Sequence, residues 1–400
     1  MSNYCSNPAT SVRASPYVWI WLVILLVVMI RSYLHPDKHS VFPIYSNAVA
    51  KWMEGKDSYK RTPADGMTDV YRYVPPVTVG LIPFTLLGNA AGGVLWRLVG
   101  VGVFLFGAHK FWKCFLDDNI CQRDSIYYWI LLMPLSLTSI NNGQANTLLV
   151  GLLLLATVML VENKGVYAGV CFAIACVLKI YPLCFVLLLV PWFSLKAWIG
   201  FFGTLLMAFL LPFTVQNPSY VVGQYESWFL HSSQGNRMDW TLERSYRDAW
   251  LVIRAWKIPV TQGTYKVIQG LSFLSMAGVF YCGYWKNLPS RSVCCYGLLV
   301  GSLWLLLFGP ATESSTYIFA SLPLAFGWFQ ARNQENRKYC WLYYLGVGLF
   351  ALAILAGLAK RTDLIHALGF HPLGALSLLI FFIFVWSLYI QTKMKKISKL

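Results

Sequence analysis

Residues 166–193 read VYAGVCFAIACVLKIYPLCFVLLLVPWF, an apolar stretch that is interrupted once, by Lys179-Ile180-Tyr181-Pro182. A helix needs about 20 apolar residues to cross the roughly 30 Å hydrocarbon core of a bilayer. The stretch is therefore long enough for one crossing with residues to spare, or for two short half-helices that meet near Lys179. Which of these it forms decides how the whole chain is threaded through a membrane.

The rest of the chain has the composition of a multi-pass membrane protein. Of its 400 residues, 57% are hydrophobic and only 12% are charged, and the mean hydropathy is +0.55. An average soluble domain carries about 25% charged residues. We therefore predict an all-α polytopic integral membrane protein, with further spans at 17–34, 91–113, 126–140, 145–162, 195–214, 265–285, 292–309, 314–331, 339–359 and 371–391.

Basic residues orient these spans. The formal net charge is +16, but the Lys and Arg residues lie in short segments between apolar runs, which favours membrane lipids over nucleic acid as partners. The positive-inside rule places Lys164, Lys196 and the basic C-terminal tail in the cytoplasm. Segment 166–193 must then cross an even number of times, so we predict two half-helices around Lys179 and about 12 crossings in total. Both termini are expected to be cytoplasmic, and residues 1–400 are expected to form one transmembrane domain.

This topology collects polar segments on the outer face. They are the outer loops 35–90 and 215–264 and the turns 141–144, 179–182 and 309–313. Within the first loop, apolar residues recur at helical spacing from Phe42 to Met53, which predicts a short amphipathic helix that lies in the membrane interface. Carboxylates on the outer face include Asp37, Asp57 and Glu313. The ten cysteines contain no C-x-x-C pair, so no metal is expected, and nothing in the sequence indicates a cofactor.

Four fragments on this face occur in the order found in a known family. They are Gly55-Lys56-Asp57-Ser58-Tyr59, Arg72-Tyr73-Val74-Pro75, Asn142-Gly143-Gln144-Ala145-Asn146, and Ala168-Gly169 followed by Lys179-Ile180-Tyr181-Pro182. In this order the chain resembles the bacterial membrane glycosyltransferases of family 87, which have the GT-C fold, over roughly residues 37–330. The resemblance implies transfer of a hexose, commonly mannose, from a polyprenyl-phosphate donor to a hydroxyl of a lipid or glycan, on the exported face of the plasma (inner) membrane.

The resemblance also implies an inverting displacement, in which a carboxylate activates the acceptor hydroxyl and cations hold the leaving phosphate. We expect the base to be Asp37, Asp57 or Glu313. The family usually has an acid shortly before a Tyr in the first outer loop, but the matching position here is near Val41, and Ser40-Val41 are not acidic. The expected substrate-binding residues are Arg72, Tyr73, Asn142, Gln144, Asn146, Lys179, Tyr181 and Arg237.

Each candidate has a structural alternative. Asp37 is equally compatible with a solvated loop carboxylate, and Asp57 with a local cap of its turn. Glu313 could pair with an arginine, Lys179 could extend to the interface, and the three amide side chains could stabilise helix ends. Broken helices with polar residues at membrane depth are also typical of transporters and flippases. The missing acid near Val41 is compatible with a non-catalytic relative that binds lipid carriers.

Overall fold

The computed structural model describes residues 16–60, 70–117, 124–233 and 238–397, and the regular structure in these ranges is helical throughout. The α-helices are α1 (Pro16–Leu34), α2 (Phe42–Met53), α3 (Pro75–Thr85), α4 (Gly88–Phe115), α5 (Ser125–Asn142), α6 (Asn146–Val161), α7 (Gly165–Leu178), α8 (Leu183–Leu189), α9 (Leu195–Leu210), α10 (Pro218–Ser233), α11 (Ala249–Ala255), α12 (Gln262–Trp285), α13 (Ser290–Phe308), α14 (Ser321–Arg332), α15 (Cys340–Leu358), α16 (Thr362–Leu368) and α17 (Phe370–Ile397). Short 3-10 helices include η3 (Val190–Trp192), η4 (Leu211–Thr214), η5 (Leu242–Arg244), η6 (Ser314–Ala320) and η7 (Gln334–Tyr339).

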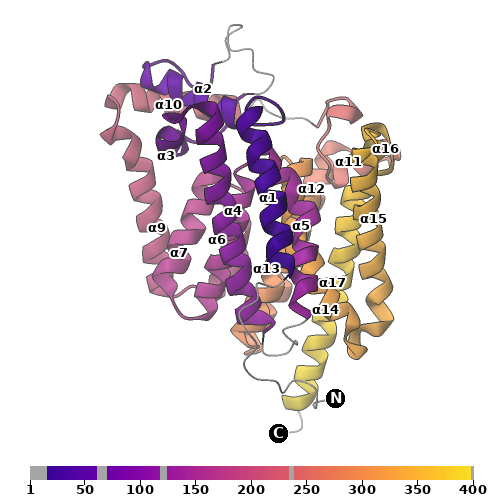
Figure 1. The fold of residues 1–400 in the computed structure, drawn as a ribbon. Helices are drawn as coiled ribbons and strands as arrows, with labels where there is room; N and C mark the ends of the chain where they lie inside the picture. Colours follow the sequence, from indigo (N-terminus) through magenta and orange to yellow (C-terminus); the bar gives the residue numbers. More distant parts are fainter. Residues whose placement is uncertain (1–15, 61–69, 118–123, 234–237, 398–400) are drawn as a thin grey trace.

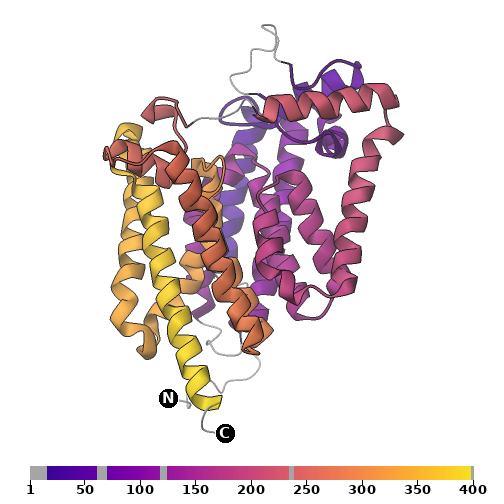
Figure 2. The same ribbon diagram turned by 180° about the vertical axis from the view of Figure 1, so that it is seen from behind.

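The long helices lie side by side in a bundle whose two ends differ (Figure 1). Helix α1 begins and α17 ends at the lower face in this view. The short helices α2, α3, α10, α11 and α16 gather at the opposite, upper face. Seen from behind, α10 lies across this upper face, turned sharply away from the direction of α9 (Figure 2). The described parts of the two long loops therefore lie at the same end of the bundle.

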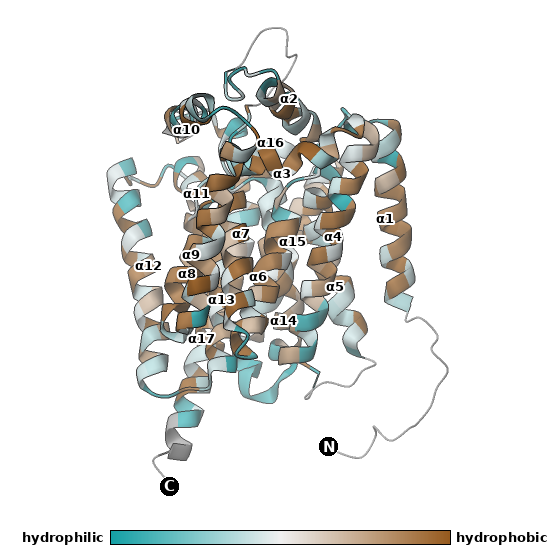
Figure 3. Ribbon diagram, turned by 90° about the vertical axis from the view of Figure 1, so that its left-hand side faces the viewer, coloured by the Kyte–Doolittle hydropathy of each residue, from teal (hydrophilic) through white to brown (hydrophobic). Residues whose placement is uncertain are grey.

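Seven helical segments in the described ranges are long and apolar enough to cross a membrane. They are α1, α4, α9 with η4, α12, α13, η7 with α15, and most of α17. The long helices are apolar along their length and more polar at their ends (Figure 3), and large apolar side chains are exposed on their outer surfaces, such as Val27 at 60% and Met207 at 69%. A multi-pass membrane protein is confirmed. The total of about 12 crossings stays a prediction, because α6, α7 and α8 are shorter than the roughly 20 residues of a full span.

Segment 166–193 is broken where the sequence predicts. Helix α7 ends at Leu178, Lys179 is extended with φ −154° and ψ 144°, and α8 begins at Leu183, directly after Pro182. The first half-helix has 14 residues, and the second has 7 before it continues as η3. At 1.5 Å per residue neither reaches across about 30 Å of hydrocarbon by itself. The expectation of two short half-helices around Lys179 is confirmed.

Small residues let α7 pack closely against α9. A Cβ atom built on Gly169 would lie 2.1 Å from the carbonyl oxygen of Ala197 and 2.6 Å from the backbone nitrogen of Phe201. On the other helix, a Cβ on Gly200 would lie 2.3 Å from the carbonyl oxygen of Val166. Such close backbone approach is the usual way in which membrane helices gain packing energy. It fixes the half-helix that ends at Lys179.

Helix α2 has the predicted bounds, but its apolar stripe does not face the membrane interface. Phe42, Tyr45, Val49 and Trp52 are all buried. The stripe packs against α3 and α4, and the Tyr45 ring lies edge-on to Trp96 with a centroid distance of 6.0 Å. The prediction that this stripe lies in the membrane interface is wrong, because an apolar stripe indicates only that a face is shielded from water and does not say whether lipid or protein covers it.

Candidate functional site

The break in segment 166–193 brings Lys179 against the start of α6. Lys179 Nζ donates a hydrogen bond to Asn146 Oδ1 at 2.7 Å, and the hydroxyl of Tyr181 donates to the same oxygen at 2.9 Å. Asn146 is fully buried, and within the described residues its Nδ2 has no hydrogen-bond partner. Buried amide nitrogens are normally hydrogen-bonded. The Asn146 oxygen therefore positions both neighbours, while its nitrogen is buried without an acceptor among the described residues.

Glu313 joins this group from the turn between α13 and η6. Gln144 Nε2 donates to Glu313 Oε2 at 3.3 Å, and Lys179 is electrostatically coupled to the Glu313 carboxylate. Glu313 also caps η6, because its side chain accepts from the backbone N–H of Thr316 while its own N–H donates to Thr316 Oγ1 at 3.1 Å. The cap holds the carboxylate in place. We call the resulting group of side chains the Lys179 cluster, which consists of Gln144, Asn146, Lys179, Tyr181 and Glu313.

Arg72 and Tyr73 reach the Lys179 cluster from the first outer loop. Arg72 is exposed and is electrostatically coupled to Lys179. Tyr73 is half-buried and lies within electrostatic range of the Tyr181 phenol. The Tyr73 hydroxyl lies 2.9 Å from that of Tyr45 on α2. Two cations and one carboxylate therefore lie close together, an arrangement that can position an anionic group beside a carboxylate, since Lys and Arg both bind phosphate oxygens.

Three further tyrosines next to Tyr73 were not predicted as part of this region. Tyr45, Tyr59 and Tyr71 are buried, and their rings contact one another, with centroid distances of 5.7 Å for Tyr59–Tyr71 and 6.4 Å for Tyr45–Tyr71. The Tyr59 hydroxyl donates to the carbonyl oxygen of Tyr73 at 2.8 Å. Burial raises the pKa of both Tyr59 and Tyr71, so these phenols stay neutral. The sequence marks only Tyr59, as part of a family fragment, and nothing in it separates Tyr45 and Tyr71 from interface aromatics.

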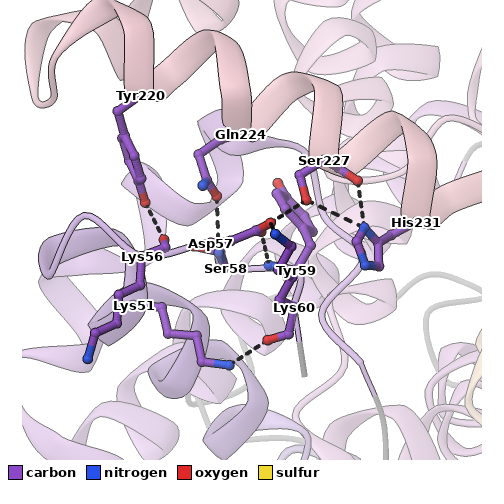
Figure 4. Close-up of polar contacts among 10 residues, drawn as sticks. All are labelled: Lys51, Lys56, Asp57, Ser58, Tyr59, Lys60, Tyr220, Gln224, Ser227 and His231. Atoms are coloured by element: carbon purple, nitrogen blue, oxygen red, sulfur yellow. Dashed lines mark hydrogen bonds and ion pairs between the residues drawn. The ribbon is translucent and has the colours of Figure 1, made fainter. Parts of the chain in front are cut away.

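Asp57 serves a different purpose, because it holds α10 on the first outer loop (Figure 4). Its Oδ1 accepts from the backbone N–H of Tyr59 at 2.9 Å, and its Oδ2 accepts from Ser227 Oγ at 2.7 Å. One residue on, the backbone N–H of Ser58 donates to Gln224 Oε1 at 3.1 Å. The bond from Tyr59 matches the local turn role that is the structural alternative for Asp57, and the bond from Ser227 adds a link to α10.

Two of the remaining sequence candidates, Asp37 and Asn142, have no hydrogen bond or ion pair to the Lys179 cluster within the described residues. Asp37 is exposed in the turn after α1. Asn142 ends α5, where its carbonyl oxygen accepts from the N–H of Val41 at 2.9 Å and its side chain lies 3.4 Å from that of Asn141. Arg237 lies outside the described residues. The residues that the structure brings together are therefore Arg72, Tyr73, Gln144, Asn146, Lys179, Tyr181 and Glu313.

A buried arginine lies where the family resemblance leads us to expect an acid. Arg97 of α4 is 4% exposed and donates to Ser40 Oγ at 3.0 Å, to the carbonyl oxygen of Asn141 at 2.9 Å and to that of Gly93 at 2.9 Å. Within the described residues no carboxylate pairs with it. The carbonyl end of α5 carries a partial negative charge that favours a cation at this position. Arg97 thus stabilises the end of α5 next to Ser40-Val41.

A family model described as glycosyltransferase family 87 matches residues 71–354. The chain belongs to glycosyltransferase family 87. The matched region contains the whole Lys179 cluster together with Arg72 and Tyr73, so the charged site lies in the part of the chain that defines the family. The predicted resemblance is confirmed, and this family 87 protein is a membrane glycosyltransferase.

Comparison with curated proteins and with solved structures gives little further information on this family 87 protein. No curated protein matches it. Among solved structures, ArnT from Cupriavidus metallidurans bound to undecaprenyl phosphate is similar at 14% sequence identity, over 92% of this chain and 77% of that one, with a TM-score of 0.37. At that score nothing about the site follows from the comparison. In the described ranges, no group of three or more His, Cys, Asp or Glu residues could hold a metal ion.

Proposed function

We propose that this family 87 protein is an inverting, GT-C-type hexosyltransferase that moves a hexose, expected to be mannose, from a polyprenyl phosphate to a hydroxyl of a lipid or glycan. The observation that carries the proposal is the Lys179 cluster, where a carboxylate, a lysine and an unpartnered buried amide meet among apolar helices. A lipid-borne donor suits such a site. Its prenyl chain can remain in the bilayer while only phosphate and sugar enter the protein.

The proposed roles follow from the charges. Lys179 and Arg72 hold the phosphate of the donor, and Glu313 accepts the proton of the acceptor hydroxyl. The acceptor oxygen forms a bond to the anomeric carbon as the bond from that carbon to the phosphate oxygen breaks. Negative charge grows on the departing phosphate during this step, so fixed cations there lower the barrier. The amides of Asn146 and Gln144 are placed to hydrogen-bond sugar hydroxyls.

The proposal includes an orientation in the plasma (inner) membrane. Both termini lie in the cytoplasm and the Lys179 cluster opens to the exported face. Support comes from the basic residues Lys164, in the α6–α7 connection, and Lys196, in the first turn of α9 directly after the α8–α9 connection. These connections lie at the same end of the bundle as the start of α1 (Figure 1). The positive-inside rule makes that end cytoplasmic.

The test is sugar transfer by purified protein in lipid nanodiscs. Radiolabelled mannose is supplied as polyprenyl-phosphate mannose or as a nucleotide sugar, with membrane extract as the source of acceptor. The expected result is labelled product from the lipid-linked donor alone. Lys179→Met should abolish this product, while Lys164→Met, which removes a lysine at the opposite end of the bundle, should leave it intact.

One outcome of this assay would contradict the proposal. If the wild type binds the carrier but transfers no sugar from polyprenyl-phosphate mannose or from other polyprenyl-phosphate hexoses, hexosyl transfer is wrong. The absence of an acid at Ser40-Val41 then favours a non-catalytic relative that binds lipid carriers. Movement of the carrier across vesicle membranes containing the protein would instead favour a flippase.

A further inference from the structure

Arg247, between η5 and α11, is fixed by its backbone against the turn that carries Glu313. Its N–H donates to the carbonyl oxygen of Thr312 at 2.7 Å, and its own carbonyl oxygen accepts from the hydroxyl of Tyr317 at 2.6 Å. Tyr317 is only 1% exposed. Two hydrogen bonds between distant parts of the chain therefore set where the Arg247 side chain begins.

The guanidinium of Arg247 has no hydrogen bond or ion pair to any part of the chain that the structure describes, although the side chain is half-buried. Burial lowers its pKa. A guanidinium has five N–H donors, and shielding such donors from water without an acceptor costs free energy. Native proteins leave few polar groups in this state. An arginine whose backbone is held this firmly and whose side chain is unpartnered is suited to an acceptor that comes from outside the chain.

Other polar atoms around the same turn are also unpartnered. Thr312 Oγ1, Ser315 Oγ and His371 Nδ1 are buried and have no hydrogen-bond partner among the described residues. The exposed fractions of these three residues are 1%, 1% and 6%. His371 is electrostatically coupled to Arg247. One turn thus carries two buried hydroxyls and a nearby imidazole, each able to donate a hydrogen bond to an oxygen.

Glu313 lies within electrostatic range of more than one cation. The Glu313 carboxylate is coupled to Lys179 and also to Arg247. Arg72 is coupled to Lys179 as well. Two cations, Lys179 and Arg247, therefore act on one carboxylate, and Arg72 acts on the first of them. A phosphate group supplies negative charge and several acceptor oxygens together, and the planar fork of an arginine binds two such oxygens at once.

We propose that Arg247 binds the phosphoryl group of the donor together with Lys179, and that the hydroxyls of Thr312 and Ser315 donate to the same group. This inference rests on the proposed function for the identity of the ligand as a lipid-linked sugar phosphate. The recognised chemistry is a phosphoryl oxygen group, and either a lipid carrier or free phosphate could present it.

The experiment measures binding rather than transfer. Purified protein in nanodiscs is titrated with a polyprenyl monophosphate, with the matching polyprenol that lacks phosphate, and with inorganic phosphate as a competitor. Arg247→Gln should weaken binding of the monophosphate by tenfold to a hundredfold, because a charge-assisted bond is worth roughly 1.5–3 kcal/mol, and leave polyprenol binding unchanged. Arg247→Lys should recover part of the loss. The matched control is Arg244→Gln, which removes an exposed charge three residues away.

Thr312→Val and Ser315→Ala provide a second route if Arg247→Gln unfolds, and each should weaken monophosphate binding several-fold. Competition by inorganic phosphate at millimolar concentration would identify free phosphate as the source, whereas no competition identifies the lipid headgroup. The inference is overturned if Arg247→Gln, like the control Arg244→Gln, binds the monophosphate as tightly as the wild type. It is also overturned if Arg247→Gln weakens binding of polyprenol as much as binding of the monophosphate. Arg247-dependent binding without any sugar transfer would instead refute the proposed function and leave this inference standing.

Discussion

Replacing Gly169 by alanine should separate the half-helix that ends at Lys179 from its neighbour. The new Cβ would lie 2.1 Å from the carbonyl oxygen of Ala197, whereas ordinary contact begins at 3.4 Å. The two helices must therefore move apart by about 1.3 Å (3.4 minus 2.1). The close atoms are backbone on the α9 side, so no side-chain rotation relieves the clash. Overpacking of this kind costs roughly 1–3 kcal/mol, and we expect the upper end of that range.

Two measurements check this prediction. Equilibrium unfolding in mixed micelles gives the free energy of unfolding, and titration with a polyprenyl monophosphate reports whether Lys179 is still in place. The control is Gly203→Ala on α9, where an added Cβ meets no atom within 4 Å. It should be neutral or should stabilise by up to about 1 kcal/mol, since alanine favours the helix. If Gly169→Ala is as stable as the wild type and binds the carrier equally well, the close approach of α7 and α9 is wrong.

Two further predictions concern single polar residues. Asn146→Leu removes the acceptor of both Lys179 and Tyr181. It should therefore lower the free energy of unfolding by about 2–4 kcal/mol. Equal stability of mutant and wild type in the same micelle assay would contradict this prediction. Asp248, at the N-cap of α11, has a pKa that burial raises to about 6. The folded state therefore binds its proton more tightly than the unfolded state does. Stability from this group should fall as the pH rises from about 4 to about 6, by up to about 3 kcal/mol. In Asp248→Asn, melting temperatures measured across this pH range should no longer show this fall in stability. An identical pH dependence in mutant and wild type would refute the raised pKa of Asp248.

The sequence predicted those parts of the fold that depend on local spacing and on charge. The break at Lys179 followed from the requirement that Lys164 and Lys196 lie on one side, together with a proline at the break. The existence and bounds of helix α2 were predicted from apolar spacing alone. The direction in which its stripe faces could not be predicted, since lipid and the protein interior are equally apolar and both accept the same side chains.

The site was predictable only in part, for a related reason. Gln144, Asn146, Lys179 and Glu313 stand at turns that the topology placed at one end of the bundle, so their convergence could be expected. Arg247 could not be found this way. Its position depends on backbone hydrogen bonds to Thr312 and Tyr317, and the sequence of a charged loop carries no signal for such a pairing.

We propose that Glu313 is the base of a sugar transfer in which Lys179 and Arg72 hold the donor phosphate. The most direct test is the rate of a single turnover with pre-bound polyprenyl-phosphate mannose in Glu313→Gln, compared with Asp37→Asn and Asp57→Asn. We expect a loss of roughly 10²–10⁴-fold for Glu313→Gln, with donor binding retained, and a rate near that of the wild type for Asp37→Asn and Asp57→Asn. Full activity in Glu313→Gln together with its loss in either aspartate variant would show that Glu313 is not the base.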